Sequence, residues 1–371
     1  MSRAAAGCLL LAVLAGRPAA AQAPHGRGHL HIIAVGDINF ARGIARDYIF
    51  AGKGDSIFAD VRDTLRAADL AIGNLESILL DRGDSTDSTG TMVFAGPHMA
   101  APLLVDAGFD AVSTANNHAW DFGRRGLLES LRHLDAAGIP HSGTGPSLKD
   151  AYRPAIIDRA GWRVAVFSVT DIINLKGLVL TGTPAACCIA WADTTILGPR
   201  MRAARDSLGA DLVLVMLHAG NEYRERPPVE LHALMRGLIA AGADAVIGHH
   251  PHVPQGVERF RGRPILYSLG NFVFRQPFPW TDKALAAEFD ADPDGTIALT
   301  LRPVNADYVP RFATGLDSAA ILVRVDSLSR WPRRRERGPA ITPRGIRSTP
   351  PSPAAADSTP PPVRPTPPPG A

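Results

Sequence analysis

Short apolar runs that stop abruptly at polar residues recur along this chain. Runs of this length, rich in valine, isoleucine and leucine, are typical of buried strands. The predicted strands cover residues 30–37, 69–76, 110–114, 139–142, 163–169, 210–218 and 244–248. Apolar residues at helical spacing between these runs predict helices over residues 40–50, 97–107, 124–137, 196–207 and 229–241. The alternation of strands with helices indicates a single α/β domain, which we place at residues 30–328.

Three other stretches have weaker patterns. Residues 297–301 and 320–325 alternate apolar with polar side chains, which predicts two late antiparallel strands. Residues 170–195 have no clear periodicity. A loop of that length inside a compact domain is usually functional or mobile.

The N-terminus has the pattern of a secretory signal peptide. Arg3 precedes an apolar run over residues 4–16, which is too short for an ordinary transmembrane helix, and small residues around Ala21 form a cleavage site. We predict that residues 1–21 are removed on export, which would place the protein in the periplasm, on the cell surface or outside the cell. An uncleaved anchor is the alternative.

Residues 337–371 differ in composition from the rest of the chain. Proline, with serine and threonine, dominates residues 349–370, and such a segment cannot bury a core. We predict a disordered or polyproline-II-like tail, which is either a spacer or a solvated tail without a role.

Composition and charge exclude some classes of function. Hydrophobic residues make up 46% of the chain and charged residues 20%, as in ordinary globular proteins. The net charge of +3 is small, and much of it lies in residues 330–337, so we expect no nucleic-acid partner. Once the signal peptide is removed, only Cys187 and Cys188 remain, too few for a disulfide framework or a sulfur-based zinc site.

Polar residues gather where the predicted strands end. They are Asp37 with Asn39, Asn74 with Glu76, Asn116 to His118, His218, and His250 with His252. Ligands of parallel α/β sheets bind beyond the carboxyl ends of the strands. Carboxylates, imidazoles and amide oxygens suit two divalent metals about 3.5–4 Å apart with a bridging carboxylate. Taken singly, an aspartate here is more often a helix cap, and a histidine is more often structural.

The order of these motifs resembles a known family. The motifs are Gly36-Asp37, Asn74-Leu75-Glu76, Asn116-Asn117-His118 with Asp121 and Gly123, His218-x-Gly220-x-Glu222-Tyr223, Gly248-x-His250-Pro251-His252 and Tyr267-Ser268-Leu269-Gly270-Asn271-Phe272. This set resembles the CapA family of poly-γ-glutamate capsule biosynthesis, which is similar to the calcineurin-like metallophosphoesterases. The resemblance implies a metallophosphoesterase-like α/β sandwich with two central β-sheets flanked by helices.

The resemblance also implies a set of metal ligands. They are Asp37, Asn39, Glu76, Asn117, His218, His250 and His252. Glu76 corresponds to the carboxylate that bridges two metals, and Asn39 stands where the fold usually has a histidine. His249 falls at a position that the pattern leaves free, so we expect it to point away from the metals. Two divalent ions are implied, with manganese, iron, zinc and magnesium all plausible.

Three further residues are candidates for catalysis. The resemblance makes His118 an acid that does not bind metal. Asp121 either orients His118 or caps the helix over residues 124–137. Glu222 is either a general acid or base or a partner of Arg224 or Arg226. Residues 270–271 either line the floor of the site or form a tight turn.

Two functions follow from the resemblance. The first is an exported metal-dependent hydrolase or transferase that acts on an anionic envelope polymer, with poly-γ-glutamate as the implied substrate. The second is a non-catalytic assembly or export factor that holds the polymer in the same pocket. A plain phosphodiesterase is a weaker third reading, because a fold alone does not fix function. Either main function implies a membrane complex for polymer synthesis or export as partner.

Overall fold

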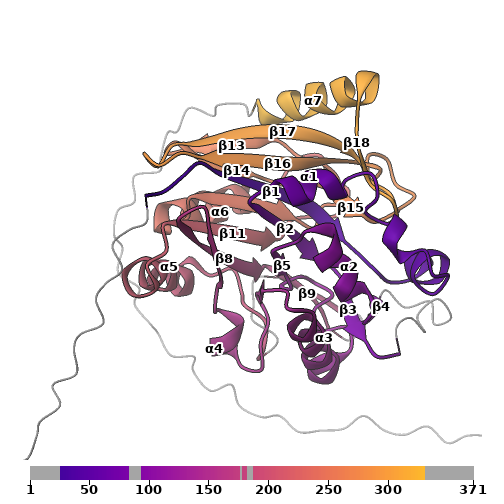
Figure 1. The fold of residues 1–371 in the computed structure, drawn as a ribbon. Coiled ribbons are helices and arrows are strands. Elements are labelled where there is room, and N and C mark those ends of the chain that lie inside the picture. Colours follow the sequence, from indigo (N-terminus) through magenta and orange to yellow (C-terminus); the bar gives the residue numbers. More distant parts are fainter. Residues whose placement is uncertain (1–25, 83–92, 176–177, 182–186, 331–371) are drawn as a thin grey trace, which may run out of the picture. The chain divides into compact units, whose positions relative to one another are not determined.

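Two β-sheets lie face to face at the centre of the fold (Figure 1). The computed structural model describes residues 26–82, 93–175, 178–181 and 187–330. The predicted signal peptide and the proline-rich tail lie outside these residues. Among the helices of the described residues, none is long and apolar enough to cross a membrane.

The first sheet has a parallel half and an antiparallel half. The parallel half runs β1-β2-β5-β6, with β15 also paired to β1, and the antiparallel half adds β16, β17 and β18. Its strands are β1 (Leu30–Ile38), β2 (Leu70–Leu75), β5 (Ala111–Ser113), β6 (His141–Ser142), β15 (Asn271–Val273), β16 (Lys283–Ala291), β17 (Ile297–Asn305) and β18 (Arg311–Phe312).

The second sheet has the order β13-β14-β12-β11-β8-β7, with four parallel strands between two antiparallel edges. Its strands are β7 (Ala155–Arg159), β8 (Trp162–Thr170), β11 (Leu212–His218), β12 (Ala245–His249), β13 (Val257–Phe260) and β14 (Arg263–Leu266). Two short pairs stand apart from both sheets: β3 (Ile78–Leu80) with β4 (Ala95–Pro97), and β9 (Ile172–Leu175) with β10 (Leu178–Thr181).

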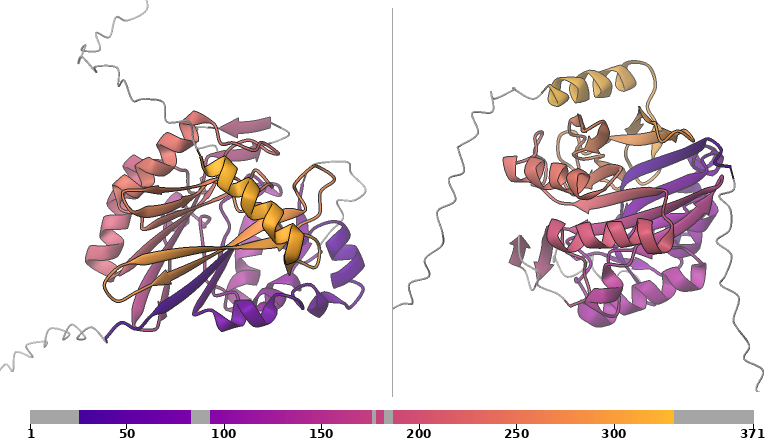
Figure 2. Two further views of the ribbon diagram at one scale, coloured as in Figure 1. Left: turned by 90° about the horizontal axis from the view of Figure 1, so that it is seen from above. Right: turned by 90° about the vertical axis from the view of Figure 1, so that its left-hand side faces the viewer.

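Helices cover the outer faces of both sheets (Figure 2). The helices are α1 (Arg62–Ala67), α2 (Ala100–Ala107), α3 (Gly123–Ala137), α4 (Leu148–Ala151), α5 (Thr194–Leu208), α6 (Val229–Ala241) and α7 (Gly315–Ser329). Apolar side chains of α2 and α3 pack on the first sheet, and those of α5 and α6 pack on the second. A third apolar layer joins the inner faces of the two sheets. This arrangement confirms the predicted α/β sandwich.

The predicted elements are mostly present, and two are wrong. Residues 320–325 belong to α7, in which the buried Ile321, Val325 and Leu328 recur at helical spacing. The helix predicted over residues 40–50 is reduced to a π-helical turn at Ala45–Ile49, after Arg42 with a φ of 60°. Within the stretch predicted as a loop, the structure places the β9–β10 hairpin.

A four-residue crossover, residues 267–270, connects β14 in the second sheet with β15 in the first. The Leu269 N–H donates to the Gly248 carbonyl at 3.1 Å, and the Asp37 N–H donates to the Gly270 carbonyl at 3.0 Å. A β-carbon at Gly248 would collide with the Tyr267 carbonyl, and one at Gly36 would collide with the Gly270 carbonyl. The two glycines therefore let this backbone lie directly against β12 and β1.

This close packing predicts a strong effect of one methyl group. Gly248→Ala should lower the free energy of unfolding by about 1–3 kcal/mol, because β12 is held by strand pairing and the crossover backbone by hydrogen bonds to Gly248 and Gly256. Gly198→Ala is the control, since its β-carbon would meet Ala241 at an ordinary 3.5 Å and it lies within α5. That control should be neutral or stabilising by up to about 1 kcal/mol. Urea titration of both variants measures the difference, and equal stabilities would contradict this account.

Candidate metal centre

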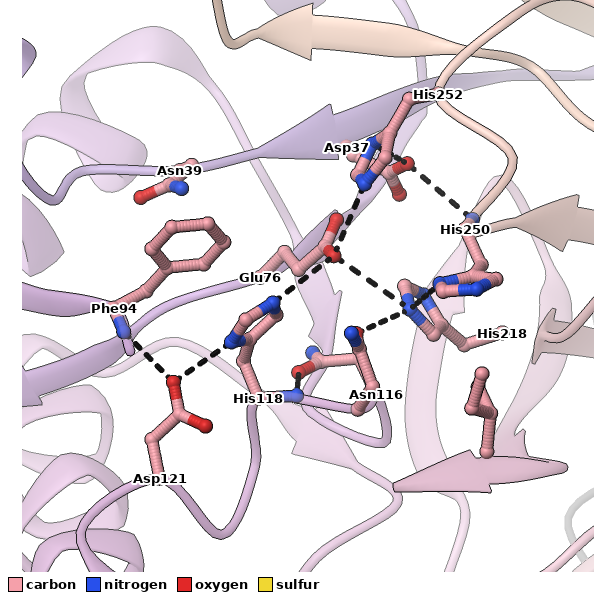
Figure 3. Close-up of polar contacts among 12 residues, drawn as sticks. Asp37, Asn39, Glu76, Phe94, Asn116, His118, Asp121, His218, His250 and His252 are labelled. Carbon is pink, nitrogen blue, oxygen red and sulfur yellow. Dashed lines mark hydrogen bonds and ion pairs between the residues drawn. The ribbon is translucent and has the colours of Figure 1, made fainter. Parts of the chain in front are cut away.

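The strand ends of both sheets deliver one buried cluster of carboxylates and imidazoles (Figure 3). Asp37 lies in β1 and Glu76 directly follows β2, both in the first sheet. His218 is the last residue of β11, and His250 and His252 follow β12 in the second sheet. Sequence positions more than 200 residues apart are thus brought together between the two sheets, as the strand-end pattern predicts.

Glu76 lies at the middle of the cluster. Its Oε1 is 3.7 Å from Nε2 of His218, 3.7 Å from Nε2 of His252 and 4.0 Å from Nε2 of His118. Neither carboxylate oxygen has a hydrogen-bond partner among the described residues. Burial raises the pKa of Glu76 well above its usual value, and the charges of Asp37, Glu222 and Asp121 raise it further. A buried carboxylate without partners is costly, and a bound cation would remove that cost.

One group of potential ligands lies on the second-sheet side of Glu76. The ligand atoms of Glu76, His218 and His250 all lie within 4.8 Å of one another. Nε2 of His218 is also 2.8 Å from Oδ1 of Asn117 and 3.1 Å from Nδ1 of His250. Burial lowers the pKa of His218, as do the neighbouring histidines, and burial with His252 lowers the pKa of His250 to about 3. Both imidazoles are therefore neutral at pH 7, the state in which they bind metals.

A second group lies on the first-sheet side of Glu76 and shares that carboxylate. Asp37, Glu76 and His252 place ligand atoms within 4.8 Å of one another, and Nδ1 of His252 is 3.3 Å from Oδ2 of Asp37. Burial raises the pKa of Asp37, but hydrogen bonds from His249 and His252 outweigh this effect and hold the pKa well below its usual value. Two overlapping groups with a common carboxylate have a donor set that fits divalent metal ions.

His249 does not lie where the sequence analysis expects it. Its Nδ1 is 3.2 Å from Oδ1 of Asp37, and the side chain is 1% exposed. The expectation that it points away from the site is wrong. The strand register explains the difference, because His249 lies opposite His218 in the β11–β12 pair.

Asn39 also differs from the expectation. Its Oδ1 accepts a hydrogen bond from the Ala41 N–H at 2.7 Å, and Figure 3 shows its amide apart from the carboxylates and imidazoles. The amide therefore closes a local turn here. The structure does not bring Asn39 into the cluster with the other predicted ligands.

His118 lies beside the cluster and is held by Asp121. Nδ1 of His118 donates to Oδ2 of Asp121 at 2.7 Å, and the Phe94 N–H donates to the same oxygen at 2.7 Å. The Phe94 ring covers the imidazole, with ring centroids 3.9 Å apart. The residue capping α3 is Phe122, so Asp121 orients His118 and does not cap the helix. Nε2 of His118 is thereby directed towards Glu76.

Glu222 lies at the edge of the cluster. Its carboxylate is within 4.8 Å of ligand atoms of His250 and His252, and it is partly exposed. The next residue, Tyr223, has a φ of 60°, and its ring stacks at 6.0 Å on His252. Glu222 is therefore placed where a carboxylate can face both the cluster and solvent.

Two asparagines support the cluster without appearing among the predicted ligands. Oδ1 of Asn271 is 2.9 Å from Nδ1 of His252, and Nδ2 of Asn74 donates to Oδ1 of Asp37 at 2.8 Å. Such partners orient metal-binding side chains. Both asparagines interrupt otherwise apolar strand runs, and this interruption is a sequence signal that could have marked them as site residues. Asn271 is the first residue of β15, directly after the crossover, so the motif of residues 267–272 contributes to the site as well as to the fold.

The backbone at the end of β12 is unusual. His250 and His252 have φ angles of 96° and 59°, a region that residues other than glycine seldom adopt. Such strain persists only where surrounding contacts impose it, and it concentrates at functional sites. In this conformation the His250 N–H donates to Oδ2 of Asp37 at 3.3 Å, and Nδ1 of His252 lies 3.3 Å from the same oxygen.

The fold and the cluster define an α/β-sandwich protein with a candidate metal centre between its two sheets. The sequence model of the bacterial capsule synthesis protein family PGA_cap matches residues 31–276, and the chain belongs to this family. This confirms the resemblance found in the motifs.

Similar proteins include two CapA proteins. The capsule biosynthesis protein CapA of Bacillus anthracis is 29% identical over 280 residues, which are 74% of this chain and 67% of that protein. The PGA biosynthesis protein CapA of Bacillus subtilis is 31% identical over 273 residues, 73% and 70% of the two chains. Among solved structures, the sulfate thiohydrolase SoxB of Thermus thermophilus aligns with 16% identity and a TM-score of 0.44, over 82% of this chain and 61% of that one.

Proposed function

We propose that this chain is an exported metal-dependent hydrolase or transferase that acts on an anionic envelope polymer such as poly-γ-glutamate. The CapA relatives are named for capsule and PGA biosynthesis, which supports an envelope polymer as the substrate. The cluster of carboxylates and imidazoles supports a metal-dependent reaction. The observation that carries the proposal is a buried Glu76 carboxylate that has no hydrogen-bond partner among the described residues and faces His118, an imidazole oriented by Asp121.

Two divalent ions would be held by the two groups that share Glu76. One group is Glu76, Asn117, His218 and His250, and the other is Asp37, Glu76 and His252. The donors suit manganese, iron, zinc or magnesium. Bound there, such ions supply Lewis acidity and lower the pKa of water.

The chain's own residues then perform the proton transfer. Asp121 fixes the His118 ring so that Nε2 faces the reacting centre, and His118 protonates the leaving group. Phe94 covers the imidazole face and excludes water from it. Glu222, at the edge of the cluster, is placed to receive a proton from an incoming nucleophile.

One observation favours the binding factor as second candidate. Because the Asn39 amide is occupied by a local turn, the group around Asp37 has one donor fewer than the resemblance implies. A weaker metal site there would suit retention of polymer carboxylates better than turnover.

The deciding experiment combines metal content with activity. Purified mature protein should contain divalent metal by mass spectrometry, and it should act on γ-linked glutamate polymer in a metal-dependent way. Polymers of α-linked glutamate and a simple phosphodiester serve as comparison substrates. Metal-loaded protein that binds the polymer without cleaving or transferring it would favour the binding factor.

The proposal includes export and a membrane polymer-synthesis or export complex as partner, with no nucleic acid involved. N-terminal sequencing of the protein from the extracytoplasmic fraction should give a chain that begins after Ala21. An intact Met1 in a cytoplasmic pool would contradict export.

A further inference from the structure

Three metal-ligating side chains meet at a second place, outside the cluster around Glu76. Asp81 follows β3, His98 follows β4, and His133 lies in the third turn of α3. Their ligand atoms all lie within 4.8 Å of one another. None of the three has a role in the proposed reaction.

The backbone holds these side chains in place. Leu80 and Pro97 are partners in the parallel β3–β4 pair, so Asp81 and His98, the next residue of each strand, emerge side by side. The His98 N–H donates to the Leu80 carbonyl at 3.0 Å, which fixes this register beyond the strands. The backbone positions of Asp81 and His98 are therefore set by strand pairing.

Helix α3 is fixed to the same strands. The Leu79 N–H donates to Oγ of Ser130 at 3.1 Å, and the Asp81 N–H donates to Oε1 of Glu129 at 2.7 Å. His133 lies one turn after Glu129 and therefore on the same face of α3. The helix thus presents His133 directly to Asp81.

The distances are close to those of a zinc site. Nε2 of His133 is 2.8 Å from Oδ1 of Asp81, and the rings of His98 and His133 stack with centroids 5.0 Å apart. Tetrahedral zinc with bonds of about 2.0–2.1 Å separates its donor atoms by about 3.4 Å. The Asp81 side chain is 59% exposed, so it can move by the required fraction of an ångström.

We propose that Asp81, His98 and His133 form a surface Zn²⁺ site. Two imidazoles and one carboxylate are a common zinc donor set, and a water molecule would take the fourth position. Arg132 Nη2 lies 3.1 Å from Oδ2 of Asp81 and 3.5 Å from Nε2 of His133, so the exposed Arg132 side chain would move away from His133 when metal binds Oδ1 of Asp81 and Nε2 of His133. Without metal, the same residues form an ordinary ion-pair cluster at the surface, and zinc content distinguishes these two states.

Zinc at this site would link β4 to α3. Phe94 directly precedes β4 and Asp121 lies two residues before α3, and these two residues hold His118. Zinc binding would therefore hold Phe94 and Asp121, and through them the His118 ring, more rigidly. The inference stands independently of the proposed function, because it concerns a different set of ligands.

The test uses the full mature chain. A chelator first removes all metal, Zn²⁺ is then added, and unbound Zn²⁺ is removed by desalting. His98→Gln removes one exposed ligand, so bound Zn²⁺ after desalting should fall by about one equivalent, and affinity at this site should fall about 100-fold or more. His141→Gln is the matched control, because His141 also pairs with an aspartate of α3, with Nε2 3.1 Å from Oδ1 of Asp135. That variant should bind as much Zn²⁺ as wild type.

A second variant, Asp81→Asn, should reproduce the loss and guards against a folding defect at His98. The increase in melting temperature on adding Zn²⁺ should shrink in both site variants relative to His141→Gln. Equal zinc content in wild type and both site variants, or the same loss in His141→Gln, would overturn the proposal.

Discussion

His118→Asn should lower turnover by about 10²–10⁴-fold while leaving the metal content unchanged. The imidazole is oriented by Asp121, and its Nε2 is 4.0 Å from Oε1 of Glu76. It belongs to neither of the ligand groups around Glu76, so its loss removes a proton donor and no metal ligand. Turnover of γ-linked polymer and bound metal per chain, measured together, test this expectation.

Asp121→Asn should also lower turnover, but by a smaller factor than His118→Asn, because His118 remains and only its ring is held more weakly. His141→Gln, a partly buried histidine on β6 outside the cluster, should leave turnover unchanged. If His118→Asn turned over substrate at the wild-type rate, His118 would not be the general acid. A loss of metal in that variant would instead make His118 a ligand.

Glu76→Gln should produce the opposite pattern, in which metal and activity are lost together. The substitution removes one negative charge from the position shared by both ligand groups. We expect metal affinity to fall by at least about 100-fold, since changes even to residues that only support ligands cost about 10–100-fold. Calorimetric titration of metal into chelator-treated protein measures the affinity.

The same substitution should not destabilise the metal-free protein. In the absence of metal, the Glu76 carboxyl is buried without a hydrogen-bond partner and burial raises its pKa, so a neutral amide of similar size adds no further cost. Metal-free Glu76→Gln should therefore melt at or above the wild-type temperature, whereas added metal should stabilise only the wild type. Glu288→Gln, on β16 and 14% exposed, is the carboxylate control. A variant that unfolds without metal would contradict the account of Glu76.

The regular elements of the fold could be predicted because their patterns are local. The helix over residues 229–241 and the buried strands follow directly from apolar spacing. Residues 320–325 fit the strand period as well as the helical one because the run is short, and only the full spacing of Ile321, Val325 and Leu328 identifies a helix. The β9–β10 hairpin has too few residues for its period to stand out.

The ends of the predicted strands indicate which residues form the cluster. They do not indicate the direction in which each side chain points. Positive φ angles at His250 and His252 turn the chain after β12, and no local sequence signal announces them in residues other than glycine. The position of His249 depends on strand register, and the turn at Asn39 depends on which hydrogen bond its amide makes. Phe94 lay beyond sequence reasoning, because it reaches His118 only through tertiary packing.

The crossover at residues 267–270 has a consequence for motion. Leu269 is hydrogen-bonded to Gly248 of one sheet and accepts from Leu285 of the other, while Gly270 accepts from Asp37. The two halves of the site therefore cannot swing apart like the lobes of a hinged enzyme. Exchange of a ligand would then need rearrangement only at the rim, so ligand exchange and domain unfolding would have separate barriers.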